Sequence, residues 1–477
     1  MRRFEKEESF LKLEKGNRPV VCVQGLGFVG AAMAVAVSNA KDTEGNRLYD
    51  VIGVDLPTEE GKRRADAITQ GLLPFENSDI QLKEALASAH RAGNLIAVTN
   101  SSVYTMADVI IVDVNLDISY EGGKADVPLS GFRKAIQTIG ESVQPDTLII
   151  VETTVPPGTC ENVVVPELNQ ALVKRGLPKH QVHVSHSYER VMPGKDYLDS
   201  IINYWRVYAG VTEEAGDRCE TFLSSIINTK DYPMTRLHST TASETAKVLE
   251  NSYRAMTIAF MEEWGRFAES VDIDMFQIIE AIRMRPTHSN MRQPGFGVGG
   301  YCLTKDPLFA QIAAEKYYQL SHIDFEFCKR AVEVNRKMPM VSFNKLYNHF
   351  KQDLKGKKVA LFGVSYRQDV GDTRYSPSEP FVKKLTESEA IVDCYDPLVP
   401  RWEEMKMDVQ QQLPSAPYDA MVFAVGHQEY RQIDFRQWLN GRTPLVLDAN
   451  NVLSDEQRLQ LRTIGCDVIS IGRGDNL

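Results

Sequence analysis

The chain has 477 residues, of which 43% are hydrophobic and 25% charged, and its formal net charge is −10. This composition is typical of a globular protein, and the length predicts about three domains. The acidic balance argues against nucleic acid as a partner, because an acidic surface repels phosphate backbones. A phosphate-bearing ligand would have to be held by local Lys and Arg side chains and backbone amides, and we expect a small ligand.

The seven cysteines are spread singly along the chain, without a CxxC pair or a Cys/His cluster. This pattern argues against a zinc site and against a disulfide framework, so we expect no metal and reduced thiols. The first 18 residues are rich in Lys, Arg and Glu, and no later run is long and apolar enough to cross a membrane. We therefore expect a cytoplasmic protein that does not act on a membrane.

The first predicted elements form a dinucleotide-binding pattern. Residues 19–24 (PVVCVQ) predict a buried strand, GLGFVG follows at 25–30, and an Ala/Val/Met-rich helix is expected over 31–38. A second predicted strand, 51–54, ends in Asp55. A lone GxGxxG is a weak signal, but strand, glycines, helix and a second strand with a terminal acid form the fingerprint in its structural setting.

Each glycine of this pattern has a physical reason. Gly25 would permit the tight turn, Gly27 would let a pyrophosphate approach the backbone, and Gly30 would let the helix pack on the sheet. Asp55 would accept hydrogen bonds from ribose hydroxyls and repel a 2′-phosphate, which favours NAD over NADP. The distance in sequence from Gly30 to Asp55 is longer than usual, and a loop insertion at 39–50 would account for it.

Three further predicted strands follow at 107–112, 147–151 and 181–184, each a short apolar run typical of a parallel sheet. Ligands of open α/β sheets bind at the carboxyl ends of strands, which singles out DVN at 113–115, ETTVPPGT at 152–159 and SHSYERVMPG at 185–194. Glu189 could act as a general base. The alternative is an exposed pair with Arg190, which is the commoner meaning of adjacent opposite charges.

The middle of the chain predicts a long helix over 239–284 that contains Glu244, Lys247 and Asn251. Lys247 and Asn251 are four residues apart and share a helix face, which for such residues is ordinarily a solvated one.

The helix leads to GFGVGGYCLTKD at 295–306, where four glycines within six positions precede Cys302. Such a loop can press its backbone against a ligand and present a thiol, which Lys305 or a helix starting near 306–307 could keep as the thiolate. An incidental cysteine in a Gly-rich turn is the alternative.

A second predicted helix, 307–335, leads to a strand-rich region with strands expected near 357–364, 390–395, 420–425 and 445–448. This is again a Rossmann-like rhythm, but without a dinucleotide fingerprint. We therefore predict an α/β fold in which two Rossmann-like, doubly wound lobes are joined by a long central helical region.

Six motifs occur along the chain: GLGFVG at 25–30, TTVPPGT at 153–159, YERVMPG at 188–194, SETAKVLEN at 243–251, GFGVGGYCLTKDP at 295–307 and GDTRYSPS at 371–378. In this order they resemble the nucleotide-sugar dehydrogenases of the UDP-glucose/GDP-mannose dehydrogenase superfamily. The resemblance covers nearly the whole chain. It implies an NAD-binding domain over 1–232, a central helical dimerisation and catalytic domain over 233–340, and a UDP-sugar-binding domain over 341–477. It also implies a homodimer or higher homo-oligomer, paired through the central helix.

The resemblance further implies oxidation of the C6 alcohol of a UDP-sugar to a carboxylate with two NAD, in the synthesis of a surface polysaccharide precursor. Cys302 would attack the aldehyde to form a thiohemiacetal, and oxidation would turn this into a thioester that water hydrolyses. Lys247 would stabilise oxyanions, with Asn251 as a neutral donor. Asp306 and Thr154 would position water or relay a proton, and Glu189 would be the base for hydrolysis.

Binding residues follow from the same resemblance. Those predicted for the cofactor are Gly25, Gly27, Phe28, Val29, Gly30, Asp55, Thr154 and Lys305. Those predicted for the substrate are Glu189, Arg190, Lys247, Asn251, Gly297, Gly299 and Arg374. Arg374 resembles the family's arginine that reaches the nucleotide in the neighbouring subunit, and its fork suits a diphosphate.

The Glu-Arg-Val form at 189–191 and the CLTKD ending of the thiol loop resemble the branch that oxidises UDP-N-acetylhexosamines. UDP-glucose or GDP-mannose 6-dehydrogenase is the alternative, since Tyr301 stands where that branch often has His and Tyr188 replaces the usual Pro. A 6-phosphogluconate-type hydroxyacid dehydrogenase would need neither Cys302 nor the third lobe. A non-catalytic sugar-nucleotide-binding protein would not retain Cys302, Lys247, Glu189 and Asp306 together.

Overall fold

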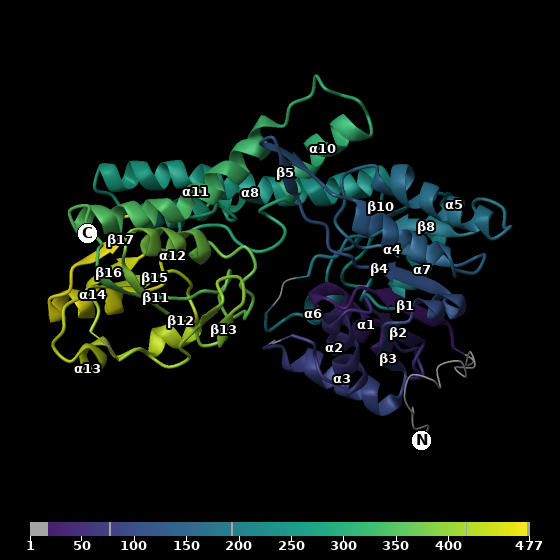
Figure 1. Cartoon of the computed structure of the whole chain (residues 1–477), viewed down its shortest axis with the longest axis horizontal. Coiled ribbons are helices and arrows are strands. Elements are labelled where there is room, and N and C mark those ends of the chain that lie inside the picture. Colours follow the sequence, from purple (N-terminus) through teal and green to yellow (C-terminus); the bar gives the residue numbers. More distant parts are fainter. Residues whose placement is uncertain (1–17, 76–77, 192–193, 416, 475–477) are drawn as a thin grey trace. The chain divides into compact units, whose positions relative to one another are not determined.

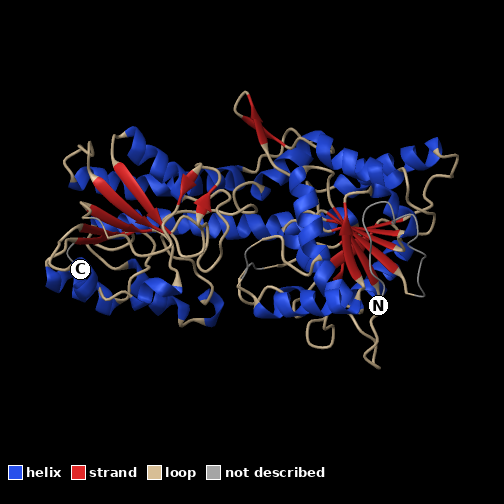
Figure 2. Ribbon diagram, turned by 60° about the horizontal axis from the view of Figure 1, so that its bottom comes forward, coloured by secondary structure: helices blue, strands red, loops and turns tan. Residues whose placement is uncertain are grey.

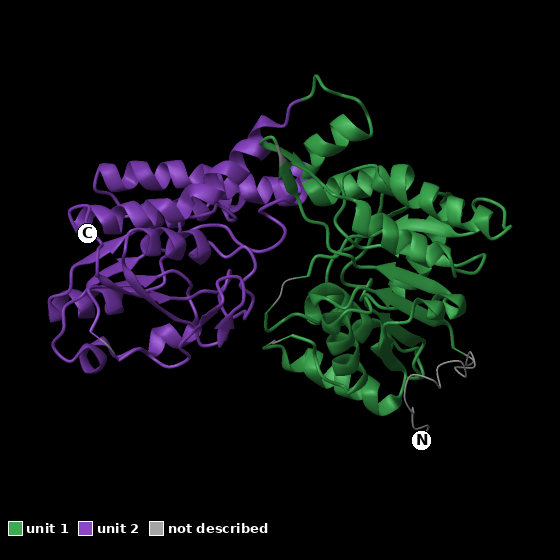
Figure 3. Cartoon of the chain, in the orientation of Figure 1, with its two compact units in different colours: residues 1–248, 309–323 green, residues 249–308, 324–477 purple. Residues whose placement is uncertain are grey.

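The computed structural model describes residues 18–75, 78–191, 194–415 and 417–474. The charged N-terminal stretch up to residue 17, and Met192 and Pro193 of the YERVMPG motif, lie outside the described residues. The chain forms two compact units, residues 1–248 with 309–323 and residues 249–308 with 324–477 (Figure 3). Helix α8 (Thr240–Ser270) contributes residues to both units. The three-domain division expected from the sequence stays a prediction.

Unit 1 is built on an eight-stranded sheet of order β10-β9-β8-β7-β4-β1-β2-β3 (Figure 1). Its strands are β1 (Val20–Gln24), β2 (Asp50–Val54), β3 (Leu95–Val98), β4 (Val109–Val112), β7 (Leu148–Val151), β8 (His183–His186), β9 (Val207–Gly210) and β10 (Thr235–Arg236). Neighbouring strands are parallel except β8 and β9. The order reverses between β1 and β4, and ligands of doubly wound sheets bind at such a switch point.

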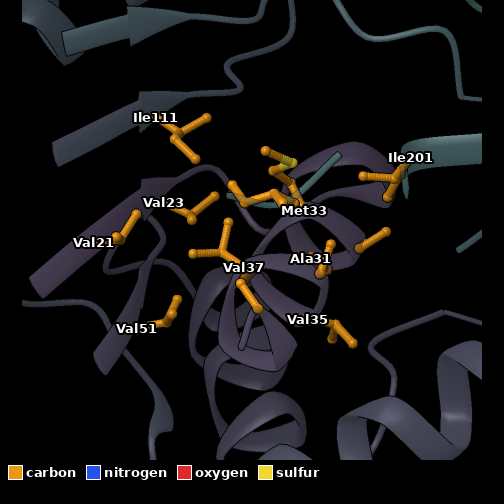
Figure 4. Close-up of a cluster of buried hydrophobic side chains, with 14 of the residues drawn as sticks. Val21, Val23, Ala31, Met33, Val35, Val37, Val51, Ile111 and Ile201 are labelled. Carbon is orange, nitrogen blue, oxygen red and sulfur yellow. The ribbon is translucent and has the colours of Figure 1, made fainter. Parts of the chain in front are cut away.

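Helices and a small hairpin complete this unit. The helices are α1 (Phe28–Asn39), α2 (Glu59–Thr69), α3 (Ile80–Ala92), α4 (Ser130–Gly140), α5 (Val165–Lys174), α6 (Asp199–Ile202), α7 (Glu213–Ser224) and α10 (Phe309–Lys316), and the hairpin is β5 (Ser119–Glu121) with β6 (Lys124–Asp126). Helix α1 is apolar nearly all round, so it lies in the core, where its residues 31–37 pack near Val21, Val23 and Val51 (Figure 4).

Unit 2 contains a five-stranded parallel sheet of order β12-β11-β15-β16-β17, again with helices on both faces (Figure 2). Its strands are β11 (Lys358–Phe362), β12 (Ile391–Tyr395), β15 (Ala420–Phe423), β16 (Leu445–Asp448) and β17 (Val468–Ser470), with the hairpin β13 (Arg401–Trp402) and β14 (Met407–Asp408). Its helices, besides most of α8, are α9 (Met275–Arg283), α11 (Glu326–His349), α12 (Ser378–Glu387), α13 (Phe435–Leu439) and α14 (Asp455–Ile464). The α/β prediction with two Rossmann-like lobes is confirmed.

Two helix predictions were wrong in extent. The stretch 239–284 is two helices, because Asp272 adopts a left-handed conformation (φ 59°) and Asp274 caps the start of α9. The stretch 307–335 is also two helices, α10 and α11, separated by a turn in which Gln319 is left-handed (φ 54°). None of the described helices combines the length and the apolar character needed to cross a membrane.

Candidate active site

The glycine loop at the start of unit 1 follows the expected geometry. Gly25 has φ 91°, and a Cβ there would lie 2.2 Å from the carbonyl oxygen of Asp113. A Cβ on Gly30 would lie 1.9 Å from the carbonyl oxygen of Gly25, whereas a Cβ on Gly27 would meet no described atom within 4 Å. Gly25 and Gly30 are therefore required by the fold, while Gly27 keeps open the space in which a ligand would approach the backbone.

The N-terminus of α1 directly follows this loop and carries Phe28 and Val29 in its first turn. No described side chain caps it and its first turn holds no acid, so its N–H groups can bind an anion. Phe28 stacks on Phe75 with ring centroids 4.4 Å apart, which fixes the loop laterally. These residues fit a dinucleotide pyrophosphate.

Asp55 lies at the end of β2, where its Oδ2 accepts the N–H of Leu26 at 3.2 Å. Its carboxylate also pairs with Arg64 at 3.3 Å. The second lobe repeats this turn, since Gly363 has φ 100° and Asp396 accepts the N–H groups of Val364 and Ser365. Asp396, however, is fully buried and also bonded to His427, whereas the Asp55 side chain is 6% exposed, so the acid of the first lobe is the less enclosed of the two.

The YERV segment and α8 meet in unit 1. The Lys247 ammonium donates to the carbonyl oxygen of Glu189 at 2.8 Å and lies 3.5 Å from its Oε1. It also lies 5.3 Å from the ring centroid of Tyr188, and the Arg190 guanidinium lies 5.6 Å from the same centroid. The Lys247 and Glu189 side chains are only 9% and 12% exposed, so the reading of either as a solvated surface charge is wrong.

The loop that carries Thr154 is held by Glu244, a buried acid on α8 to which the sequence assigned no role. Glu244 accepts the N–H groups of Gly158 and Cys160, the latter at 2.8 Å. Burial raises the pKa of Glu244 to about 7 despite these hydrogen bonds. Thr154 itself is half-buried, one residue after Thr153, whose hydroxyl accepts the N–H of Val114 at 2.9 Å.

The thiol loop lies in unit 2. Gly300 has φ 81°, and a Cβ there would lie 2.7 Å from the ring of Tyr366; a Cβ on Gly299 would be equally close to that residue, and one on Gly297 would lie 2.5 Å from Pro377. The glycines thus let this loop pack against the second Rossmann-like lobe. Cys302 follows as one of two cysteines that are not buried, the other being Cys328.

A three-residue network stands next to Cys302. Asp306 is fully buried, and its two oxygens accept hydrogen bonds from Asn251 at 2.8 Å and from Lys305 at 2.6 Å. The Lys305 ammonium also lies 4.3 Å from the ring centroid of Tyr301. Lys305, which the resemblance assigns to the cofactor, therefore has a carboxylate partner within unit 2.

Arg374 is also engaged within unit 2. Its guanidinium makes a bidentate pair with Asp372, at 3.0 Å through Nε and 2.7 Å through Nη2, and lies 5.7 Å from the ring centroid of Tyr301. Its carbonyl oxygen accepts the N–H of Gly300 at 3.2 Å, so the GDTRYSPS motif directly braces the thiol loop.

A pocket of about 350 Å³ opens in unit 2 beside these motifs. It is lined by Gln293, Phe296, Gly297, Tyr366, Arg367, Gln368, Pro377, Ala424, Val425, Gly426, Arg431, Asn450, Asn451 and Val452. Most of these residues follow the carboxyl ends of β11, β15 and β16, where the strand order of this sheet reverses. Apart from Gly297, sequence reasoning missed the lining; the rule that ligands bind at strand ends could have found it.

The structure therefore brings Glu189 and Lys247 together in unit 1, and Asn251, Lys305 and Asp306 together in unit 2. Lys247 and Asn251 lie one turn apart on α8.

Comparison with known proteins adds an independent finding. Three family models match the chain: the NAD binding domain of the UDP-glucose/GDP-mannose dehydrogenase family over residues 20–226, its central domain over 241–337 and its UDP binding domain over 360–455. A UDP-N-acetyl-D-mannosamine dehydrogenase of Methanocaldococcus jannaschii is 30% identical over 450 residues, 93% of this chain and 95% of that protein. One of Pyrococcus horikoshii is 28% identical over 459 residues, 95% of this chain and 99% of that protein. A solved structure of UDP-D-ManNAc dehydrogenase from P. horikoshii aligns with TM-score 0.79 at 25% identity, covering 96% of this chain and all of that one.

Proposed function

Because the chain belongs to the UDP-glucose/GDP-mannose dehydrogenase family, it is an NAD-dependent nucleotide-sugar dehydrogenase, and we propose that it oxidises C6 of a UDP-N-acetylhexosamine to the carboxylate through Cys302. The product would be a precursor of a surface polysaccharide. The observation that carries the proposal is the accessible thiol on a glycine loop, three and four residues before the buried Lys305–Asp306 pair that Asn251 holds.

Oxidation of an alcohol to an acid removes four electrons from the substrate, and two hydride transfers carry them away. NAD, when bound, is the hydride acceptor at each oxidation. Between them the Cys302 sulfur would add to the C6 aldehyde, and the oxygen would take a proton to give a thiohemiacetal. Loss of the second hydride and of the hydroxyl proton leaves a thioester, whose C–S bond breaks when water adds. The acid is released and the thiol is restored.

The residues around Cys302 have chemically distinct tasks in this scheme. Asp306 would hold the water or take its proton, since both of its oxygens are already oriented by Asn251 and Lys305. Asn251 retains a second amide N–H that can donate to an oxygen at C6.

The unit 1 residues would supply charge and base. Lys247 would stabilise the oxyanions that develop at C6, and its preorganisation by the Glu189 carbonyl supports this role. Glu189 would act as base in hydrolysis, with Thr154 relaying a proton or positioning water. Gly25, Gly27, Phe28, Val29, Gly30 and Asp55 would hold the cofactor.

We assign the UDP portion of the substrate to the pocket of unit 2. Most of its lining lies in the segment that matches the UDP binding domain, which supports this, and Arg367 and Arg431 would give it positive charge for a diphosphate. The acetamido sugar is supported by relatives named UDP-N-acetyl-D-mannosamine dehydrogenase and by the Glu189-Arg190-Val191 sequence. Arg190, held over Tyr188, would contact the sugar.

A homodimer is supported by an apolar stripe on α8. Leu249, Tyr253, Phe260, Trp264 and Phe267 of α8, and Val271 directly after its last residue, are each 46–64% exposed. Their spacing of three, four or seven residues places them on one face, and rows of exposed large apolar side chains mark interaction surfaces. Sedimentation of Trp264→Glu should show a shift toward the monomer, whereas an unchanged species would remove the stripe from the interface.

The test of the function is stoichiometry. With limiting UDP-N-acetylhexosamine, two NADH should form per sugar nucleotide and no aldehyde should accumulate. A ratio of one would instead indicate a simple alcohol dehydrogenase.

A further inference from the structure

Two neighbouring acids at strand ends in unit 1 have no role in the scheme above. Asp113 follows the last residue of β4 and Glu152 follows the last residue of β7, and these strands are adjacent with Val112 opposite Val151. The Glu152 side chain is 0% exposed, and Asp113, although not fully buried as a residue, has an Oδ2 atom that is inaccessible to solvent. Two carboxylates so close in a dry interior cannot both ionise without a large electrostatic cost.

The nearby charges show which acid has a cation. Arg206, before β9, places its guanidinium 2.9 Å from Glu152 Oε1, in a pair that is 2% and 0% exposed. Glu189, after β8, has Lys247 as its partner. The charged groups that face Asp113 are Glu152, Glu189 and Arg206, so no further cation is left for Asp113 among them. These five side chains, three acids with Arg206 and Lys247, are neutral overall only if Asp113 keeps a proton.

Hydrogen bonding leads to the same assignment. Asp113 Oδ2 and both Glu152 oxygens receive no aligned hydrogen bond from the described residues, and two carboxylates offer only acceptors to each other. A proton on Asp113 would provide a donor toward Glu152. Consistent with this, burial and then the Glu152 charge raise the pKa of Asp113 well above its usual range, whereas Arg206 opposes the effect of burial on Glu152.

Asp113 also lies against the glycine loop. Its Cβ is 3.1 Å from where a Gly30 Cβ would stand, its carbonyl oxygen closes the space at Gly25, and its N–H donates to Gln24 at 2.8 Å. A charged carboxylate here would oppose an anionic pyrophosphate on the same loop, whereas a neutral acid packs without this repulsion.

We propose that Asp113 is a positioning residue of the dinucleotide site. It is held as a neutral carboxylic acid whose O–H donates a hydrogen bond to Glu152, and this bond fixes the 113–114 segment against the glycine loop. Val114, bonded to Thr153, carries this constraint to the segment that holds Thr154. The proposal rests on the cofactor site of the proposed function and on none of its thiol chemistry. Failure of the tests below would leave Cys302 unaffected, and failure of the Cys302 chemistry would leave Asp113 unaffected.

Infrared spectroscopy of the cofactor-free protein at neutral pH tests the proton directly. Asp113→Asn should remove one carboxylic-acid C=O band from the spectrum, and the exposed control Asp217→Asn should remove none. A spectrum of Asp113→Asn that keeps every acid band would overturn the proposal.

Affinity for NADH, titrated by fluorescence without substrate, tests the positioning. Asn and Leu have nearly the same shape, but only Asn can donate to Glu152. Asp113→Asn should bind NADH within about twofold of the natural protein, and Asp113→Leu about tenfold more weakly, since it leaves a buried acceptor unsatisfied. Equal affinities of the two variants for NADH would contradict the proposal, and so would binding by Asp113→Asn that is about tenfold tighter than that of the natural protein. If Asp113→Leu does not fold, the infrared result and the affinity of Asp113→Asn decide.

Discussion

Asn251 donates a hydrogen bond of 2.8 Å to the buried carboxylate of Asp306, across 55 positions in sequence, and so ties α8 to the segment that follows Cys302. The other oxygen of Asp306 accepts from Lys305. An acid held from both sides has a fixed orientation, which is what a group that positions water requires.

Asn251→Ala should therefore lower kcat at least about tenfold and cost about 1–3 kcal/mol of stability, because it leaves a buried charged acceptor with one partner fewer. Asn335→Ala is the control, since Asn335 is a buried Asn of unit 2 whose amide donates to the carbonyl oxygen of Ala255 at 2.9 Å. It should lose comparable stability in urea unfolding but keep kcat. Similar kcat values for the two variants would show that Asn251 acts only through stability.

Cys302→Ser should abolish uronate production, with a loss of at least about 10³-fold, because a serine hydroxyl is a far weaker nucleophile than a thiolate at neutral pH. Cys328→Ser is the control, since Cys328 is the other cysteine that is not buried. Product is measured by chromatography of the nucleotide sugars. Turnover of Cys302→Ser at the natural rate would end the covalent scheme.

Gly27→Ala should leave the melting temperature unchanged, because a Cβ there meets no described atom within 4 Å, yet weaken NADH binding by about tenfold or more by occupying the approach to the backbone. Gly131→Ala, at the second residue of α4, is the control for both measurements, because a Cβ there also meets no described atom within 4 Å. Gly30→Ala should instead destabilise the fold. Undiminished affinity in Gly27→Ala would place the pyrophosphate elsewhere.

A panel of UDP-ManNAc, UDP-GlcNAc, UDP-GalNAc, UDP-glucose and GDP-mannose should give the highest kcat/KM with an acetamido sugar, by about tenfold or more, because a site built to pair the amide leaves polar groups unsatisfied with a hydroxyl. NAD should be preferred over NADP, since Asp55 opposes a 2′-phosphate even with Arg64 at 3.3 Å. A preference for UDP-glucose would reject the branch assignment while leaving the mechanism intact. Equal use of NADP would remove Asp55 from the ribose site.

Stability should fall as pH rises from about 4.5 to 7, and Glu262 should contribute to this slope. Burial raises the pKa of Glu262 from 4.5 to about 7, with Arg266 as the opposing influence. The folded state therefore holds a proton that the unfolded state releases, so the stabilisation is complete below about 4.5 and is lost as pH rises through about 7. Glu262→Gln should flatten the slope, and its free energy of unfolding at pH 8 should exceed that of the natural protein by about 1–3 kcal/mol in urea titrations. An unchanged slope would show that folding does not raise the pKa of Glu262.

Much of the site could be assigned to segments without coordinates, because glycine loops and strand ends are local patterns. The burial and the charge partners of these residues could not be predicted in this way. The adjacent charges Glu189 and Arg190 suggested a surface pair, yet Glu189 is 12% exposed and held by Lys247, 58 residues away. Likewise, the helix pattern over 239–284 did not predict the left-handed conformation of Asp272, since apolar spacing continues on both sides of the break.

What the sequence determined by itself is the class of fold, the glycine loop before α1, and the family to which the six motifs point, because each depends on neighbours within about thirty residues. Only the tertiary structure decided that Asp113 and Glu152 share a buried edge with Arg206, that Asp306 is oriented by Asn251, and that four separate segments line the pocket of unit 2. Burial and charge pairing join residues far apart in the chain, and their energies depend on distance and on solvent exclusion, neither of which a linear pattern contains.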